Sequence, residues 1–280
     1  MAAHISTVPS SRLRAMVVPR EHGAWGMMLV PLATGAVVAA RTGINSPGLV
    51  VLFIAAMSLF WLRTPLESWM GTSAIKAQTD YERGLLTKAI VAIGAVAAGN
   101  LLALFWDGHN RGLLIIGAIA ALAFAAQAGV KKLGRKGRMP AQIIGAIGLT
   151  STAAAAYYVA TGQLDRTALA LWLANWLFAA DQIHFVQVRI HSSRAQTFAE
   201  KLRPGFFFLV AQTGLIAMIV AACRLRLFPA AIAIAFLPIL LRGTIWFARG
   251  RQPLDVHKLG FSELAQALLF AALLCAAFLL

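Results

Sequence analysis

The stretch "PREHGAWGMMLVP", residues 19–31, sets the character of the whole chain. It places Arg20, Glu21 and His22 directly before an apolar run that continues to residue 40. A proline suits the start of a helix, an acidic side chain suits its positive end, and arginine and tryptophan are typical of a membrane interface. A histidine is better suited to carrying a proton or binding a ligand. The stretch therefore predicts a helix that enters a membrane, with His22 as a candidate site residue.

The composition indicates an integral membrane protein. Of the 280 residues, 60% are hydrophobic and 12% are charged, whereas an ordinary globular domain is roughly 25% charged. The net charge of +15 comes from short basic clusters between long apolar runs, a pattern that concerns membrane topology and lipid contact. We therefore expect membrane lipid, and no nucleic acid, as a partner. Cys223 and Cys275 show no metal-ligand or redox spacing, so we expect free thiols.

Apolar runs in this chain are long enough to cross a bilayer core, which takes about 20 helical residues. Nine such runs predict an all-α, polytopic helical bundle of about nine transmembrane helices. Residues 1–19 are expected to form a cytoplasmic N-terminal tail, and residues 20–280 a single transmembrane domain. The nine runs lie near residues 23–40, 47–66, 85–106, 112–130, 140–161, 168–188, 205–223, 226–247 and 261–280.

The distribution of basic residues predicts the orientation of these runs. With the N-terminus in the cytoplasm, all but five of the 25 lysines and arginines fall in inner segments. Basic residues concentrate on the cytoplasmic side of membrane proteins, so we expect a cytoplasmic N-terminus and an outer C-terminus. The five outer exceptions are Arg41, Arg111, Arg166, Arg224 and Arg226.

Charged residues inside the sixth and eighth runs are candidates for function, because charges are costly in hydrocarbon. Asp181 and Arg242 each lie seven residues before the arginine that closes their helix, at similar depth, so we expect them to pair. At 100° per residue, Asp181, His184 and His191 fall on one helical face, which suits cation binding or proton transfer. In the alternative interpretation Asp181 is only a structural partner of Arg242.

The end of the second run, "FWLRTPLESWMG" at residues 60–71, forms a second candidate region. Pro65 is expected to break or kink the helix, and Arg63 and Glu67 stand four residues apart, within reach of each other on a helix. The following loop and helix start add Arg83 and Lys88. Such cations suit phosphate oxygens, although ordinary positive-inside charge explains them equally well.

The phrases "REHGAWGMMLVP" (residues 20–31) and "DQIHFVQVRIH" (residues 181–191), together with nine spans, resemble the YwiC-like family of bacterial integral membrane proteins, which has no settled activity. The resemblance implies a multi-pass protein of the bacterial plasma membrane. More distantly, the layout is similar to the UbiA-type intramembrane prenyltransferases. Those proteins carry aspartate-rich motifs after helices two and six that bind Mg²⁺ and an isoprenoid diphosphate.

The aspartate-rich motifs themselves are missing from this chain. In place of the first series stand Arg63, Glu67 and Gly71, and helix six offers Asp181 and His184. Mg²⁺ prefers oxygen ligands, so the loss of carboxylates weakens a Mg²⁺-diphosphate site. Mg²⁺ is a cofactor candidate by resemblance only, and no residue is assigned to a metal.

The leading hypothesis is a UbiA-like transferase with degenerate aspartate motifs, acting on an amphipathic, isoprenoid-type or lipid-like substrate in a chamber open to the cytoplasm. We expect the residues from helices one, two and six to converge in one polar site. The alternative is a non-catalytic membrane protein, either a transporter or an assembly partner of a membrane complex. The candidate catalytic residues are His22, Glu67, Asp181 and His184, and the candidate substrate-binding residues are Arg63, Arg83, Lys88, Arg189 and Arg242.

Overall fold

The computed structural model describes residues 10–19, 22–41, 46–108, 110–193, 195, 197–249 and 254–279, with the backbone alone at 22, 110 and 135. Within these ranges every regular element is a helix. The elements are α1 (Ser10–Val17), α2 (His22–Ala40), α3 (Gly48–Trp69), α4 (Asp80–Trp106), α5 (Asn110–Lys131), the 3-10 turn η1 (Gly134–Gly137), α6 (Arg138–Thr150), α7 (Thr152–Thr161), α8 (Arg166–His191), α9 (Phe198–Arg224), α10 (Ile232–Ala248) and α11 (Val256–Leu279).

Each of the nine predicted apolar runs is occupied by a helix, and α6 and α7 share the fifth run. In the described part of the chain, seven of these helical segments are long and apolar enough to cross a membrane. Of the other two, α10 has only 17 residues, and α8 has 26 residues but carries many polar side chains. The prediction of an all-α, polytopic membrane bundle is confirmed, and the orientation of the chain stays a prediction.

Two of the differences between the predicted and the observed helices lie near prolines. The eighth run begins at residue 226 in the prediction, but α10 begins at Ile232. The chain turns first, with Arg226 at a φ of 55° and Pro229 in the turn. Pro65 was expected to break or kink the second helix. A break is ruled out, since α3 continues to Trp69, and a kink stays a prediction. Pro65 lies close to the end of α3, where the loss of one backbone donor removes a single helical hydrogen bond.

The described helices divide into two compact units. In the first unit, α3 and α4 pack against each other and α1 contacts both. The indole of Trp61 donates to the Val17 carbonyl at 3.0 Å, and Arg12 Nε lies 2.8 Å from Glu82 Oε1. The hydroxyl of Thr79 caps α4 by accepting the Glu82 N–H. This unit also contains four predicted site residues, Arg63, Glu67, Arg83 and Lys88.

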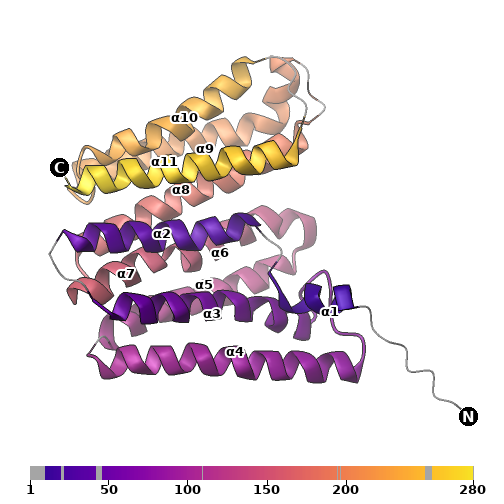
Figure 1. The fold of residues 1–280 in the computed structure, drawn as a ribbon. Helices are drawn as coiled ribbons and strands as arrows, with labels where there is room; N and C mark the ends of the chain where they lie inside the picture. Colours follow the sequence, from indigo (N-terminus) through magenta and orange to yellow (C-terminus); the bar gives the residue numbers. More distant parts are fainter. Residues whose placement is uncertain are drawn as a thin grey trace, which may run out of the picture. The chain divides into compact units, whose positions relative to one another are not determined.

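The second unit contains α2 from Gly23 onward and all helices from α5 to α11. Helix α8 is its centre, since it contacts α6, α7, α9 and α10. The helices α8, α9, α10 and α11 run alongside one another (Figure 1). Aromatic rings fill the spaces between them, for example Phe178 stacked on Phe270 with ring centroids 4.3 Å apart. This unit contains Asp181, His184, Arg189 and Arg242.

Helix α2 packs closely on α7 because Gly35 has no side chain. A Cβ atom built on Gly35 would lie 2.1 Å from the Ala153 carbonyl oxygen, which no larger residue can tolerate. Polar contacts add to this packing: the Thr152 hydroxyl donates to the Met28 carbonyl at 2.9 Å. Small residues at helix contacts and hydrogen bonds between helices are the usual means of association in a membrane.

The surface of both units is largely apolar. Many large aliphatic and aromatic side chains are at least half exposed, which would be costly in water but is expected where helices face lipid. Only 11% of the apolar window of α4 is buried inside the protein. These exposures support contact with membrane lipid. Examples in the described residues are Val91, Leu102, Leu114, Leu122, Leu169, Phe207, Val210, Leu241 and Leu268.

Candidate functional site

Two carboxylates and one guanidinium meet inside the second unit, and we call this group the ion cluster. Asp181 in α8, Arg242 in α10 and Glu263 in α11 form it. Arg242 Nη2 lies 2.8 Å from Asp181 Oδ2, and Arg242 Nη1 pairs with Glu263 Oε2. All three side chains are at least nine-tenths buried. The predicted pairing of Asp181 with Arg242 is therefore confirmed, and Glu263 is its third member.

Side chains from neighbouring helices hold the ion cluster in place. Gln212 in α9 donates through Nε2 to Asp181 Oδ1. Gln182, next to Asp181 in α8, donates to the Glu263 main-chain carbonyl at 2.9 Å. The Arg242 guanidinium lies over the Phe185 ring, 4.0 Å from its centroid. Because hydrogen bonds and ring contact fix the guanidinium, the cluster has one defined geometry.

Some polar atoms of this region have no partner. Arg242 Nε and Glu263 Oε1 are buried and make no hydrogen bond with any described residue. The same holds for the side-chain oxygens of Gln212 and Gln266. A buried polar atom without a partner costs about 1–3 kcal/mol, so native proteins rarely leave several together without a functional reason. These donor and acceptor atoms are therefore left without a partner among the described residues.

The ion cluster does not fit a divalent metal. Both oxygens of Asp181 accept hydrogen bonds, from Gln212 and Arg242, and the guanidinium stands between the two carboxylates. A fixed positive charge at that place opposes a Mg²⁺ ion. Among the described residues, no group of three or more His, Cys, Asp or Glu side chains is arranged to hold a metal.

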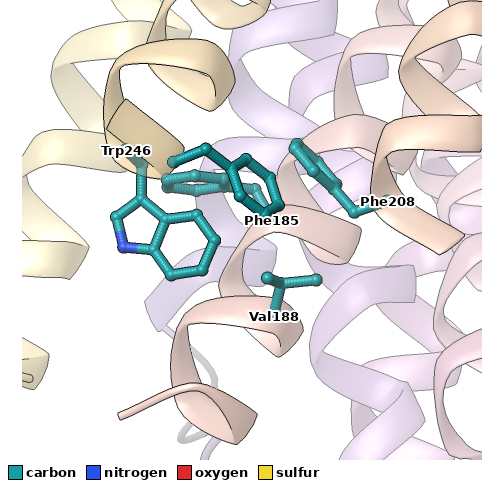
Figure 2. Close-up of a cluster of buried hydrophobic side chains, with 5 residues drawn as sticks. Phe185, Val188, Phe208 and Trp246 are labelled. Carbon is teal, nitrogen blue, oxygen red and sulfur yellow. The ribbon is translucent and has the colours of Figure 1, made fainter. Parts of the chain in front are cut away.

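An aromatic cluster separates the ion cluster from the end of α8. Phe185 and Val188 in α8, Phe208 in α9, and Trp246 and Phe247 in α10 form it. Figure 2 shows Phe185, Phe208 and Trp246 facing one another from three helices. The Phe185 and Trp246 rings meet edge to face, with centroids 6.2 Å apart. This cluster keeps the neighbourhood of Arg242 apolar, which strengthens electrostatic interactions there.

Two cations flank the ring of Trp246. Lys201 Nζ lies 4.9 Å from the ring centroid and the Arg189 guanidinium 5.8 Å from it. The Lys201 ammonium also donates to the Trp246 carbonyl at 3.0 Å and to the Arg249 carbonyl. Cations suit the negative end of a helix, and here Lys201 satisfies carbonyls at the end of α10. Arg189, a predicted substrate-binding residue, lies at the end of α8 in this position.

The histidines of α8 take different positions. His184 is half-buried, and its ring meets Phe208 edge to face with centroids 5.3 Å apart. Asp181 and His184 both face α9, because Gln212 and Phe208 belong to that helix. His191 is exposed at the end of α8, and its Nδ1 lies 2.7 Å from the Gln187 carbonyl. The helix thus continues to His191, and this histidine lies ten residues beyond Asp181.

The predicted residues of α3 and α4 lie in the first unit. Arg63 Nε pairs with Glu67 Oε1 at 2.9 Å, one helical turn apart, so the expected contact between them is confirmed. Arg83 and Lys88 are exposed on α4. Arg12 in α1 reaches Glu82 near them, and this hydrogen bond raises the pKa of Arg12 above its ordinary value.

His22 begins α2, and its side chain lies outside the described residues. The expected convergence of His22 and Glu67 with Asp181 and His184 joins residues of both compact units. It stays a prediction. The reason to expect this convergence is that the residues come from predicted helices one, two and six, at the same predicted depth.

Sequence reasoning gave less weight to Glu263 and Lys201 than the structure does. Glu263 is the one acidic residue in the last apolar run, and that isolation was the available signal. Lys201 lies among the basic residues of a predicted inner segment, but it is 1% exposed. Its burial depends on the carbonyls at the end of α10, 45 or more residues away in sequence. No local pattern reveals such a contact.

Comparison with known proteins identifies the family but no characterised relative. No curated protein and no solved structure shows a significant match to the chain. The sequence model of the family described as YwiC-like protein matches residues 18–157. The matched part includes the stretch "PREHGAWGMMLVP" and reaches into α7, whereas the ion cluster lies beyond it. The chain belongs to the YwiC-like protein family and is an integral membrane protein.

Proposed function

We propose that this protein is a membrane enzyme of UbiA-like type that acts on an amphipathic, isoprenoid-type substrate from the cytoplasmic side of a bacterial plasma membrane. The observation that carries the proposal is the ion cluster with its unpartnered atoms, Arg242 Nε and Glu263 Oε1. They offer a donor and an acceptor to a polar head group, in surroundings built from apolar helices. An isoprenoid-type tail suits such surroundings.

Each member of the ion cluster has a distinct proposed role. Asp181 uses both oxygens within the protein, so it is a positioning residue that orients the Arg242 guanidinium. Arg242 binds the head group through Nε, which makes no hydrogen bond with a described residue. Glu263 has one uncommitted carboxylate oxygen, which makes it the best candidate for a proton acceptor or donor. His184, without a hydrogen-bond partner in the described residues, is the second candidate for proton transfer.

The first unit supplies the remaining part of the proposal. Arg83 and Lys88 are exposed cations suited to an anionic head group. Arg63 and Glu67 form an ion pair that would orient the guanidinium toward a ligand. His22 would exchange a proton at the start of α2. These assignments rest on the sequence pattern and on the likeness to UbiA-type proteins.

Product formation tests this proposal. Purified protein in lipid nanodiscs is incubated with isoprenoid diphosphates and a bacterial lipid extract, with and without Mg²⁺, and new lipid species are sought by mass spectrometry. We expect a product with the wild type and its loss with Glu263→Gln, which keeps the size of the side chain. Glu200→Gln, the same change at an exposed site in α9, is the control. No product under any condition, or equal products from all three proteins, would reject the enzyme proposal.

A second candidate function is proton-coupled transport, and one feature favours it. Two buried carboxylates share a single guanidinium in direct ion pairs, and such groups in membrane spans often carry protons. The measurement is proton uptake into liposomes that contain the protein. A mixture of metabolites and extracted lipids is added outside the liposomes. Uptake that requires both Glu263 and an external solute, without product formation, would favour transport over catalysis.

A further inference from the structure

At the end of the second unit away from the ion cluster, a pocket combines arginines with apolar walls. It lies between the start of α8, the turn that joins α9 to α10, and the end of α11, and we call it the arginine pocket. Its volume is about 460 Å³, within the range of small-molecule sites. Arg166 and Arg226 line it, and Leu227, Phe228 and Phe278 supply apolar wall.

The two lining arginines are uncommitted. Both are exposed, and neither guanidinium makes an ion pair or hydrogen bond with a described residue. The acidic neighbour, Asp165, is occupied: its Oδ1 accepts the Thr167 N–H at 2.9 Å and the Ala168 N–H at 3.0 Å. Asp165 therefore caps α8 and leaves the arginines without a carboxylate partner.

Two further arginines add positive charge around the arginine pocket. Arg224 closes α9, two residues before Arg226. Arg41 Nη1 donates to the Phe278 carbonyl at 2.6 Å, so its guanidinium sits against the pocket wall. These four are among the five basic residues that the predicted topology places outside the membrane, where basic residues are normally scarce. Their gathering at one pocket calls for an anionic ligand.

The pocket is distinct from the ion cluster. Arg166 precedes Asp181 by 15 residues on the same helix, which separates them by about 22 Å along α8. The charges also differ in kind, since the ion cluster holds two carboxylates and the arginine pocket holds none among its lining residues. A ligand of the arginine pocket is therefore not the proposed substrate head group.

We propose that the arginine pocket binds the phosphate-bearing head of an anionic amphiphile, with Arg166 and Arg226 on the phosphate and Phe278 against the apolar chain. Guanidinium groups match phosphate oxygens with paired donors. The apolar wall favours a lipid over a free anion. Under the predicted topology, this ligand is a phospholipid of the outer leaflet, and it holds the ends of α8, α10 and α11 together.

Lipid binding by native mass spectrometry tests the proposal with the full chain in detergent. The probes are phosphatidylglycerol and phosphatidylcholine. We expect tighter binding of phosphatidylglycerol, and about 25-fold weaker binding when Arg166→Gln and Arg226→Gln are combined, at about fivefold for each arginine. Arg226→Gln alone, in an exposed turn, should give the fivefold loss without affecting the fold.

A matched control removes two exposed arginines from other helix ends, Arg138→Gln with Arg203→Gln, and should leave this binding unchanged. Millimolar inorganic phosphate distinguishes the two sources of ligand. If phosphate displaces the lipid, the pocket is a site for soluble phosphate anions; if it does not, the lipid is the ligand. Equal binding of both lipids, wild-type binding by the variant without Arg166 and Arg226, or an equal loss in the control would overturn the proposal.

Discussion

Removal of the Arg242 guanidinium should destabilise the protein more than any other single change in the ion cluster. Arg242→Met keeps much of the side-chain length but leaves Asp181 and Glu263 buried without a counter-charge. Breaking a buried ion pair by removing one partner typically costs about 3–5 kcal/mol. Asp181→Asn and Glu263→Gln retain hydrogen-bonding groups of the same shape, so we expect about 1–3 kcal/mol for each.

The informative measurement is the triple variant. When Arg242→Met, Asp181→Asn and Glu263→Gln are combined, no uncompensated charge remains, so the loss should be smaller than the sum of the single losses by at least about 2 kcal/mol. The assay is unfolding of the purified protein in mixed micelles, followed by tryptophan fluorescence. Arg203→Met, an exposed change in α9, should alter stability by less than about 0.5 kcal/mol. Losses that add within about 0.5 kcal/mol would refute the reasoning, because uncoupled residues behave in that way.

Three further predictions concern topology and packing. A reporter that is active only outside the cytoplasm should give signal when fused after Leu280 and none when fused after Arg138; the reverse pattern would overturn the predicted orientation. Gly35→Ala should lower the unfolding temperature, because the added Cβ meets a backbone carbonyl at 2.1 Å, whereas Gly117→Ala, with open space around it, should be neutral or stabilising by up to about 1 kcal/mol. Lys201→Met should cost about 1–3 kcal/mol in the same unfolding assay, since it strips carbonyls at the end of α10 of their donor; an unchanged midpoint would show that water replaces the ammonium.

The sequence allowed prediction of the elements and of one contact in the site, for identifiable physical reasons. Hydrocarbon thickness sets helix length, so the nine runs were found. Charge at similar depth suggested that Asp181 and Arg242 pair, and they do at 2.8 Å. The rotation of α11, which turns Glu263 toward the same guanidinium, depends on packing among four helices. The turn before α10, with Arg226 at positive φ, also lies within an apolar sequence that looks continuous. Local patterns do not encode such tertiary choices.

The close packing of α2 against helices that come later in the chain has a consequence for biogenesis. Its partners are distant in the chain: Gly35 lies against Ala153, and Thr34 Oγ1 accepts a hydrogen bond from Asn175 at 3.1 Å. During synthesis, α2 must therefore remain with this packing face uncovered until α7 and α8 have been made. The pair α3 and α4, in contrast, can associate as soon as α4 emerges, because adjacent segments close first. The second unit thus cannot assemble until its later helices have been synthesised. Until then, α2 is the segment whose packing face most needs protection.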